Sequence, residues 1–140
     1  MASPPASHAV MRLRYAADVE RIIEEFAATP NSGLLFLPDA TTFSRHELFV
    51  GLAARYRLPA VYPFRDFVDA GGLMSYSTDL AEAARLSATY VDRIVRGAKP
   101  TDLPVQAPTK YETVVNLKAA KAIGLEVPQS LLVRSDEVIE

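Results

Sequence analysis

Residues 58–76 have the sequence LPAVYPFRDFVDAGGLMSY, and this stretch decides the fold class. The apolar run Ala60–Tyr62 is followed by a second one over 73–76, and both are typical of short strands. Between them, residues 64–70 predict a short helix and the glycine pair 71–72 predicts a turn. A strand, a helix and another strand in this order indicate a unit of a parallel sheet.

The alternation of strands and helices extends upstream of this stretch. Residues 34–37 form a continuous apolar run between turn residues, which is typical of a strand buried on both faces. Residues 9–15 alternate apolar and basic side chains, which is a half-exposed strand pattern. Between these strands, Asp18 stands where an N-cap belongs and predicts a helix that ends at 30–33.

A further helix is expected between the strands at 34–37 and 60–62. Thr42 or Ser44 can provide its N-cap, and it should end near Arg57. Its inward face is predicted to consist of Leu48, Phe49, Leu52 and Ala53.

Downstream, Asp79 is predicted to cap the longest helix of the chain, and Gly97 to end it. An apolar stripe with helical spacing runs along it, made of Leu80, Ala83, Ala84, Ser87, Tyr90, Val91, Ile94 and Val95. Residues 99–108 are a constrained, proline-rich connector with no helix expected. A strand near 111–116, a helix Leu117–Ile123 ended by Gly124, and a short segment at 127–133 complete the chain.

These patterns predict an α/β fold, a three-layer α/β/α arrangement with a mainly parallel sheet. The expected organisation is a flexible tail over 1–8 and a single domain over 9–140. Half of the residues are hydrophobic and 23% are charged, which is enough apolar material for a packed core.

Composition narrows the possible functions. A net charge of −2 and a pI of about 5.7 give no basic field for nucleic acid. The chain has no cysteine, which excludes disulfides, thiolate metal sites and thiol catalysis. No apolar stretch reaches the roughly 18–20 residues that cross a bilayer, and the first seven residues carry no export signal.

The candidate binding residues follow the ends of the predicted strands, where ligands of parallel α/β sheets collect. They are Asp39, Ala40 and Thr41 after the first buried strand, Tyr62, Phe64 and Arg65 after the second, and Ser75 and Tyr76 after the third. Aromatic walls supply apolar contact area and a guanidinium recognises carboxylates, so this set suits a small zwitterion or carboxylate.

Purely structural roles are an alternative for several of these residues. Tyr62 and Phe64 can equally be core aromatics at a strand end. Arg65 can form a surface ion pair with Asp66, and Asp39 is favoured about two to one as a helix cap over a ligand contact.

No enzymatic site is expected. Ser44, His46 and Glu47 point in different directions on one helix turn, so they cannot converge on one reacting atom. The two histidines do not have the spacing of a metal site, and the glycine pair 71–72 lacks the dinucleotide fingerprint. We therefore predict no cofactor and no metal.

Several segments resemble one family, the substrate-binding proteins of ABC-type importers, which adopt the two-lobed type I periplasmic-binding-protein fold. Besides 58–76, the segments that carry the resemblance are GLLFLPD (33–39), YVDRIVRGAKPTDLPVQ (90–106), TKYETVVNLK (109–118) and LKAAKAIGL (117–125). The resemblance covers residues from about 19 to 140, and this part of the chain is similar to the last third of these proteins. It implies that two lobes close on a small solute, an aromatic amino acid in some members, and deliver it to a membrane permease.

The resemblance also implies roles for individual segments. Residues 38–40, 62–65 and 75–76 would line the second lobe's side of the cleft, with lobe crossings near 75–78 and 99–109. Family members are more than twice as long, so most of the first lobe would be missing here. The helix over 79–97 would then need another cover, and we expect a homo-oligomer formed through it.

The family implies a periplasmic or extracytoplasmic location, while a chain without an export signal is compatible with the cytoplasm. The leading hypothesis is a solute-binding component of an ABC-type importer, or its C-terminal fragment. The alternatives are an α/β dimerisation module that has lost binding, and a ligand-sensing domain.

Overall fold

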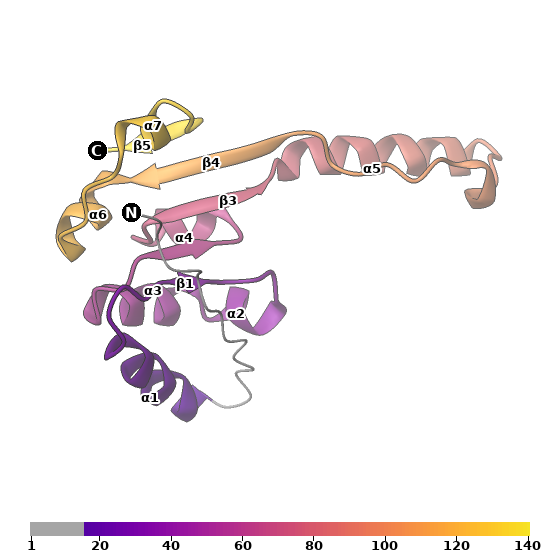
Figure 1. Ribbon diagram of the computed structural model, residues 1–140. Coiled ribbons are helices and arrows are strands. Elements are labelled where there is room, and N and C mark those ends of the chain that lie inside the picture. Colours follow the sequence, from indigo (N-terminus) through magenta and orange to yellow (C-terminus); the bar gives the residue numbers. More distant parts are fainter. Residues whose placement is uncertain (1–15) are drawn as a thin grey trace.

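The computed structural model describes residues 16–140, so the strand predicted at 9–15 and the tail predicted at 1–8 lie outside the described residues. A five-stranded sheet organises the chain (Figure 1). Its strands are β1 (Leu34–Leu35), β2 (Ala60–Tyr62), β3 (Met74–Thr78), β4 (Tyr111–Asn116) and β5 (Glu137–Ile139). They lie side by side in chain order.

The sheet is parallel except between β3 and β4. The antiparallel pair places Ser75 opposite Val114 and Thr78 opposite Tyr111. The predicted α/β class with a mainly parallel sheet is therefore confirmed. The last strand, β5, was not predicted, because its three residues follow a polar segment and provide too short a pattern.

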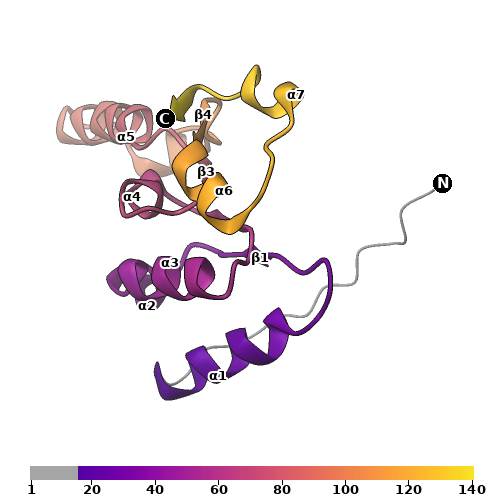
Figure 2. The ribbon, with the colours of Figure 1, turned by 90° about the vertical axis from the view of Figure 1, so that its left-hand side faces the viewer.

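Seven α-helices and one 3-10 turn connect the strands within the described residues. They are α1 (Ala16–Ala27), α2 (Ala40–Ser44), α3 (His46–Arg55), α4 (Arg65–Asp69), α5 (Leu80–Val95), η1 (Pro100–Asp102), α6 (Leu117–Ile123) and α7 (Gln129–Leu132). Figure 2 shows α3 and α4 on one side of the sheet and α7 on the other. The connector over 99–108, predicted to hold no helix, contains the turn η1.

The predicted helix starts were wrong at two places. Asp18 lies inside α1, as its third described residue, and not at an N-cap. The helix expected from Thr42 or Ser44 is two helices, because Asp39 caps α2 and the backbone of Arg45 leaves the helical region between α2 and α3. Leu48, predicted to face inward, is exposed.

The core lies on the sheet face that α3 and α4 cover. Tyr62, 1% exposed, stacks between Phe36 and Phe67 with both ring centroids 5.0 Å away. Val114 extends this face on β4 and is fully buried. This cluster fixes the carboxyl end of β2, from which two of the candidate site residues emerge.

The opposite sheet face is only partly covered within residues 16–140. Leu35 is 71% exposed, which contradicts the prediction of a strand buried on both faces. Side chains alternate between faces along a strand, so Tyr76 shares this side and is 54% exposed. The physical reason is that Leu34 and Leu35 point to opposite faces of the sheet, and only the face of Leu34 belongs to the core cluster.

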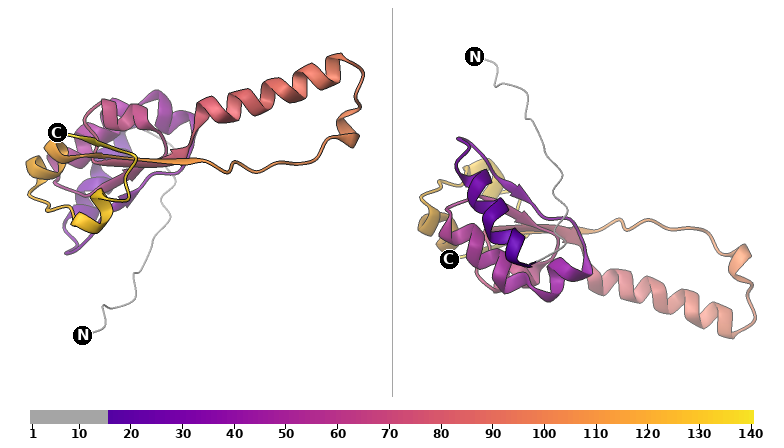
Figure 3. Two further views of the ribbon diagram at one scale, coloured as in Figure 1. Left: turned by 90° about the horizontal axis from the view of Figure 1, so that it is seen from above. Right: turned by 90° about the horizontal axis from the view of Figure 1, so that it is seen from below.

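Helix α5 and the segment that returns from it form an arm that projects away from the sheet (Figures 1 and 3). Asp79 caps the helix as predicted, by accepting a hydrogen bond from the backbone N–H of Glu82, and Gly97 ends it with a φ of 101°. No residue of α5 is buried. The apolar stripe predicted from the sequence is therefore present, with Ala83 and Tyr90 half-buried and its other members exposed within residues 16–140.

The N-cap of α5 predicts a dependence on acid. Lys110 Nζ lies 2.6 Å from Asp79 Oδ2, and this hydrogen bond, together with that from Glu82 N–H, lowers the pKa of Asp79 below its ordinary 3.8. Because the folded pKa is depressed, the stabilisation is complete above pH 3.8 and is lost as pH falls through the lowered value. We expect Asp79→Asn to lower Tm near neutral pH, and this difference from the unmodified chain to shrink in acid. A difference that stays constant with pH would contradict this role.

Candidate functional site

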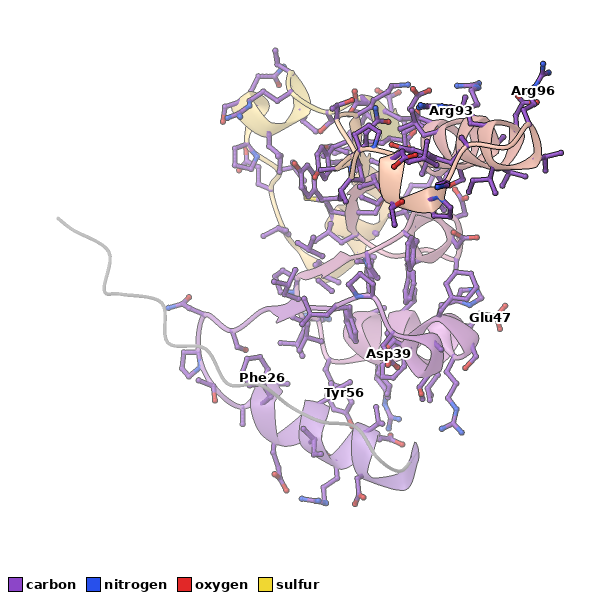
Figure 4. All side chains as sticks on the ribbon, turned by 90° about the vertical axis from the view of Figure 1, so that its right-hand side faces the viewer. Phe26, Asp39, Glu47, Tyr56, Arg93 and Arg96 are labelled. Atoms are coloured by element: carbon purple, nitrogen blue, oxygen red, sulfur yellow. The ribbon has the colours of Figure 1, made fainter. Side chains whose placement is uncertain are left out.

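The candidate site lies at the edge of the sheet where β1, β2 and β3 end. These three strands are parallel neighbours, so their carboxyl ends meet at one edge. Figure 4 looks onto this edge and shows Asp39 below the α5 arm, which carries Arg93 and Arg96. Of the residues predicted from the sequence, Tyr62 ends β2, Phe64 and Arg65 follow it, and Asp39, Ala40 and Thr41 lie four to six residues after β1. Ser75 and Tyr76, predicted to follow the third strand, lie inside β3, because this strand continues to Thr78.

Asp39, Ala40 and Thr41 form the start of α2 and are exposed. Asp39 Oδ1 accepts hydrogen bonds from the backbone N–H groups of Thr41 at 2.8 Å and Thr42 at 3.3 Å. The capping role favoured from the sequence is therefore present. Both capping hydrogen bonds use Oδ1, and the second carboxylate oxygen, Oδ2, takes no part in the cap. Asp39 is exposed at the edge of the sheet.

Tyr62 and Phe64 belong to an aromatic cluster behind the edge. The ring of Tyr62 is buried between two phenylalanines, and burial raises the pKa of its hydroxyl above the ordinary range. Phe64 is half-buried and meets Phe43 edge to face at 5.7 Å. Tyr62 therefore lies in the core behind the edge of the sheet, whereas Phe64 is partly exposed at the surface.

Ser75 and Tyr76 point to opposite faces of the sheet. Ser75 is fully buried, and its hydroxyl has no hydrogen-bond partner among the residues that the structure describes. Tyr76 lies on the exposed face and stacks on Tyr111 of β4 at 5.4 Å with an interplanar angle of 6°. The structure therefore does not bring these two side chains together.

Arg65 is the first residue of α4 and is held by three carboxylates. Its Nη2 donates a hydrogen bond to Glu137 Oε1 at 3.1 Å, and its Nη1 lies 3.0 Å from Glu137 Oε2 in an ion pair. Glu112 and Asp69 each lie 3.4 Å from the guanidinium. The hydrogen bond to Glu137 raises the pKa of Arg65, so the side chain stays charged. Its partners are these three groups and not Asp66, the neighbour proposed from the sequence.

Three residues around the site were missed by sequence reasoning. Glu112 and Glu137 face Arg65 from β4 and β5, and Tyr111 covers Tyr76. A period-2 pattern places Glu112 on the same face as Val114, but only the register between β4 and β5 shows that both carboxylates reach Arg65.

The structure offers no other obvious chemical site within residues 16–140. No group of three or more His, Asp or Glu side chains there could hold a metal ion. Likewise, none of the helices in the described part of the chain has the length and apolar character to cross a membrane. A small apolar hollow of about 70 Å³ between α3, β2 and α6 touches the site only through Tyr62.

Comparison with known proteins identifies the family. Residues 10–139 match the family model of the ABC transporter substrate binding proteins. No curated protein sequence matches the chain.

Solved structures share the fold over most of the chain. A conserved domain protein from Vibrio cholerae O1 biovar El Tor aligns with a TM-score of 0.77 and 27% identity, over 87% of this chain and 41% of that one. An ABC domain from Streptococcus pneumoniae, solved in complex with L-Trp, aligns with a TM-score of 0.76 and 23% identity, over 88% and 42%. The open, ligand-free substrate-binding protein CD0873 of Clostridium difficile aligns with a TM-score of 0.63 and 17% identity, over 90% and 41%.

This chain spans about two fifths of the length of these structures. The family model, in contrast, covers nearly all of its 140 residues. The chain belongs to the family of ABC transporter substrate-binding proteins.

Proposed function

We propose that this chain forms one wall of the solute-binding site of an ABC-type importer, and that the solute is a small amino acid or carboxylate. The observation that carries the proposal is the edge itself, where three parallel strands end in exposed polar and aromatic residues. The resemblance to a structure solved with L-Trp supports an amino acid as the solute, and an aromatic amino acid is the first to test. The family is one of binding proteins and not of enzymes.

The residues of the edge have separable roles in this proposal. Asp39, Ala40 and Thr41 contact the solute at the start of α2, while Phe64 and Tyr76 supply aromatic surface. Tyr62 and Ser75 lie in the core and hold that surface in place. Concave sites bury most of a small ligand, so this wall alone is expected to bind the solute weakly, and a wall from outside the described residues would complete the site.

The charges around Arg65 favour a zwitterion over a simple anion. One guanidinium lies among three carboxylates, so the local charge sum is +1 − 3 = −2. A solute carboxylate can share the donors of Arg65, and a solute ammonium group is attracted by Glu112 and Glu137. A dicarboxylate would meet net repulsion at this point.

The partner and the location follow from the same proposal. The binding protein delivers its solute to the permease of the importer, and it works outside the cytoplasmic membrane, where the family normally acts. Self-association through residues 79–97 is a separate question, because α5 projects away from the edge (Figure 3).

Thermal stability tests the proposal, because a ligand that binds only the folded state raises Tm by mass action. We expect Tm to rise with L-Trp or another neutral amino acid and to remain unchanged with a dicarboxylic acid. A Tm that is indifferent to every amino acid and carboxylate would contradict binding and favour the dimerisation module. Binding combined with a change in association state would favour a ligand-sensing domain.

Arg65→Ala is expected to remove the rise in Tm with the solute. The side chain is 41% exposed, so loss of its ion pairs should cost no more than about 1 kcal/mol of unfolding free energy. Arg21→Ala is the matched control, because Arg21 also pairs with two carboxylates but lies on α1, outside the site. A solute response that survives in Arg65→Ala would remove Arg65 from the site.

A further inference from the structure

A second aromatic ring lies beside Phe64 at the carboxyl edge of the sheet. Phe43 of α2 meets Phe64 edge to face, with ring centroids 5.7 Å apart and an interplanar angle of 89°. Phe43 is 44% exposed and Phe64 is half-buried. A single exposed phenylalanine is common on protein surfaces, but these two rings form one continuous apolar surface, which we call the aromatic corner. Phe43 is not among the eight site residues predicted from the sequence.

The ring of Phe43 is held in place by neighbours from two other helices. Phe67 of α4 is fully buried and its ring centroid lies 6.5 Å from that of Phe43. The ring of His46, the first residue of α3, lies 6.1 Å away, and its Nδ1 is 3.0 Å from the backbone oxygen of Phe43. A ring that is already fixed loses little conformational entropy when a ligand packs on it. The aromatic corner is therefore a preorganised surface.

The aromatic corner adjoins the polar residues of the candidate site. The backbone N–H of Phe43 donates a hydrogen bond to the backbone oxygen of Asp39 at 2.9 Å, so Phe43 lies one turn along α2 from the cap. Residues four positions apart share a side of a helix. Phe64 directly precedes Arg65, and consecutive Cα atoms are about 3.8 Å apart. The two contacting rings thus connect the cap of α2 to the charged cluster around Arg65.

The charged cluster lies on the same side of the sheet as the aromatic corner. Glu137, which binds Arg65, pairs with Val114 of β4, and Val114 pairs with Ser75 of β3. Paired residues share a sheet face, so Glu137 is on the face that α4 covers, and the aromatic corner contacts α4. Tyr76, the next residue of β3, points to the other face.

We propose that Phe43 is a specificity-determining residue of the solute site, and that its exposed ring packs against the ring of an aromatic amino acid. This inference rests on the proposed function, because it assigns the place of the solute's side chain in the same site. An aromatic amino acid carries its ring one methylene away from the carbon that bears the ammonium and carboxylate groups. Its ring and charges therefore need adjoining surfaces, as the aromatic corner and the cluster around Arg65 are. Edge-to-face and offset contacts between rings add to the gain from buried apolar area.

Binding of L-Trp and L-Ala to variants at position 43 tests the proposal, because the two solutes share their charged groups and differ in the ring. Titrations followed by amide chemical shifts give both values of Kd. Phe43→Leu keeps an apolar side chain without a ring, and we expect it to raise the Kd of L-Trp about tenfold and that of L-Ala less than about twofold. Phe43→Tyr keeps the ring and should leave the Kd of L-Trp within about twofold of that of the unmodified chain.

Phe26→Leu is the matched control. Phe26 is a half-buried phenylalanine that packs against the core from α1, outside the site, so neither Kd should change. An unchanged ratio of the two Kd values in Phe43→Leu, or equal weakening of L-Trp binding in Phe43→Leu and Phe43→Tyr, would overturn the role of Phe43 and leave the proposed function intact. Failure of the unmodified chain to bind either solute would contradict the proposed function, and this inference with it.

Discussion

Phe67→Ala is expected to lower the free energy of unfolding by about 3–5 kcal/mol, the cost typical of deleting a buried aromatic ring. Phe67 is fully buried and stacks on Tyr62 at an interplanar angle of 18°. It also meets Phe43 and His46 edge to face. Its loss therefore leaves a cavity between α4 and the sheet that closes only if α4 moves towards the sheet.

Urea denaturation followed by far-UV circular dichroism measures this cost. Phe43→Ala is the control, because Phe43 contacts the same cluster but is 44% exposed, and we expect a loss of about 1 kcal/mol. Equal losses in the two variants would contradict a core centred on Phe67 and Tyr62.

Gly72→Ala is expected to destabilise the chain by about 1–3 kcal/mol through overpacking. A Cβ atom at position 72 would lie 2.6 Å from the backbone oxygen of Phe67 and 2.7 Å from the ring of Tyr62. This backbone oxygen lies within α4 and accepts the hydrogen bond of Gly72 N–H at 2.8 Å, so it cannot move freely. The turn into β3 requires glycine because of this close approach.

Gly51→Ala is the control, and it is expected to change the free energy of unfolding in the opposite direction. Gly51 lies inside α3 with nothing within 4 Å of an added Cβ atom, so alanine should stabilise the helix by about 1 kcal/mol. The two variants are compared by their urea midpoints. A Gly72→Ala midpoint at or above that of the unmodified chain would show that the turn has room for a side chain.

Elements that are determined by local sequence could be predicted well. Helix α6 has the predicted bounds, and Gly124 ends it with a φ of 76°. Strand β2 and the Asp79 cap of α5 are also as predicted. Each of these elements carries its own start or stop signal, so no distant contact is needed to define it.

Elements that depend on distant contacts could not be predicted. Strand β5 begins where Asp136 and Thr113 exchange two hydrogen bonds, from Asp136 N–H to Thr113 O and from Thr113 N–H to the Asp136 carboxylate. These residues are 23 positions apart. The exposure of Leu35 likewise depends on which element covers β1, and a short apolar run does not contain that information.

In the candidate site, too, the features set by local sequence were predicted and those set by distant contacts were not. The existence and order of these three strands were found from the sequence, because they follow from the α/β pattern. Their ends were found only for β2, since β1 stops at Leu35 instead of 37 and β3 runs on to Thr78 instead of 76.

The environment of Arg65 could not be found from the sequence, because its partners Glu112 and Glu137 lie 47 and 72 residues away along the chain. The opposite orientation of Ser75 and Tyr76 follows from strand alternation once the bounds of β3 are known.

Chemical-shift mapping tests the central claim, that the edge formed by β1, β2 and β3 binds a small solute. The 15.3 kDa chain, labelled with ¹⁵N, is titrated with L-Trp and with other neutral amino acids. We predict amide shifts that saturate and cluster at residues 39–41, 64–65 and 75–76, with none along α1. Shifts that never saturate, or that cluster away from this edge, would contradict the proposed binding site.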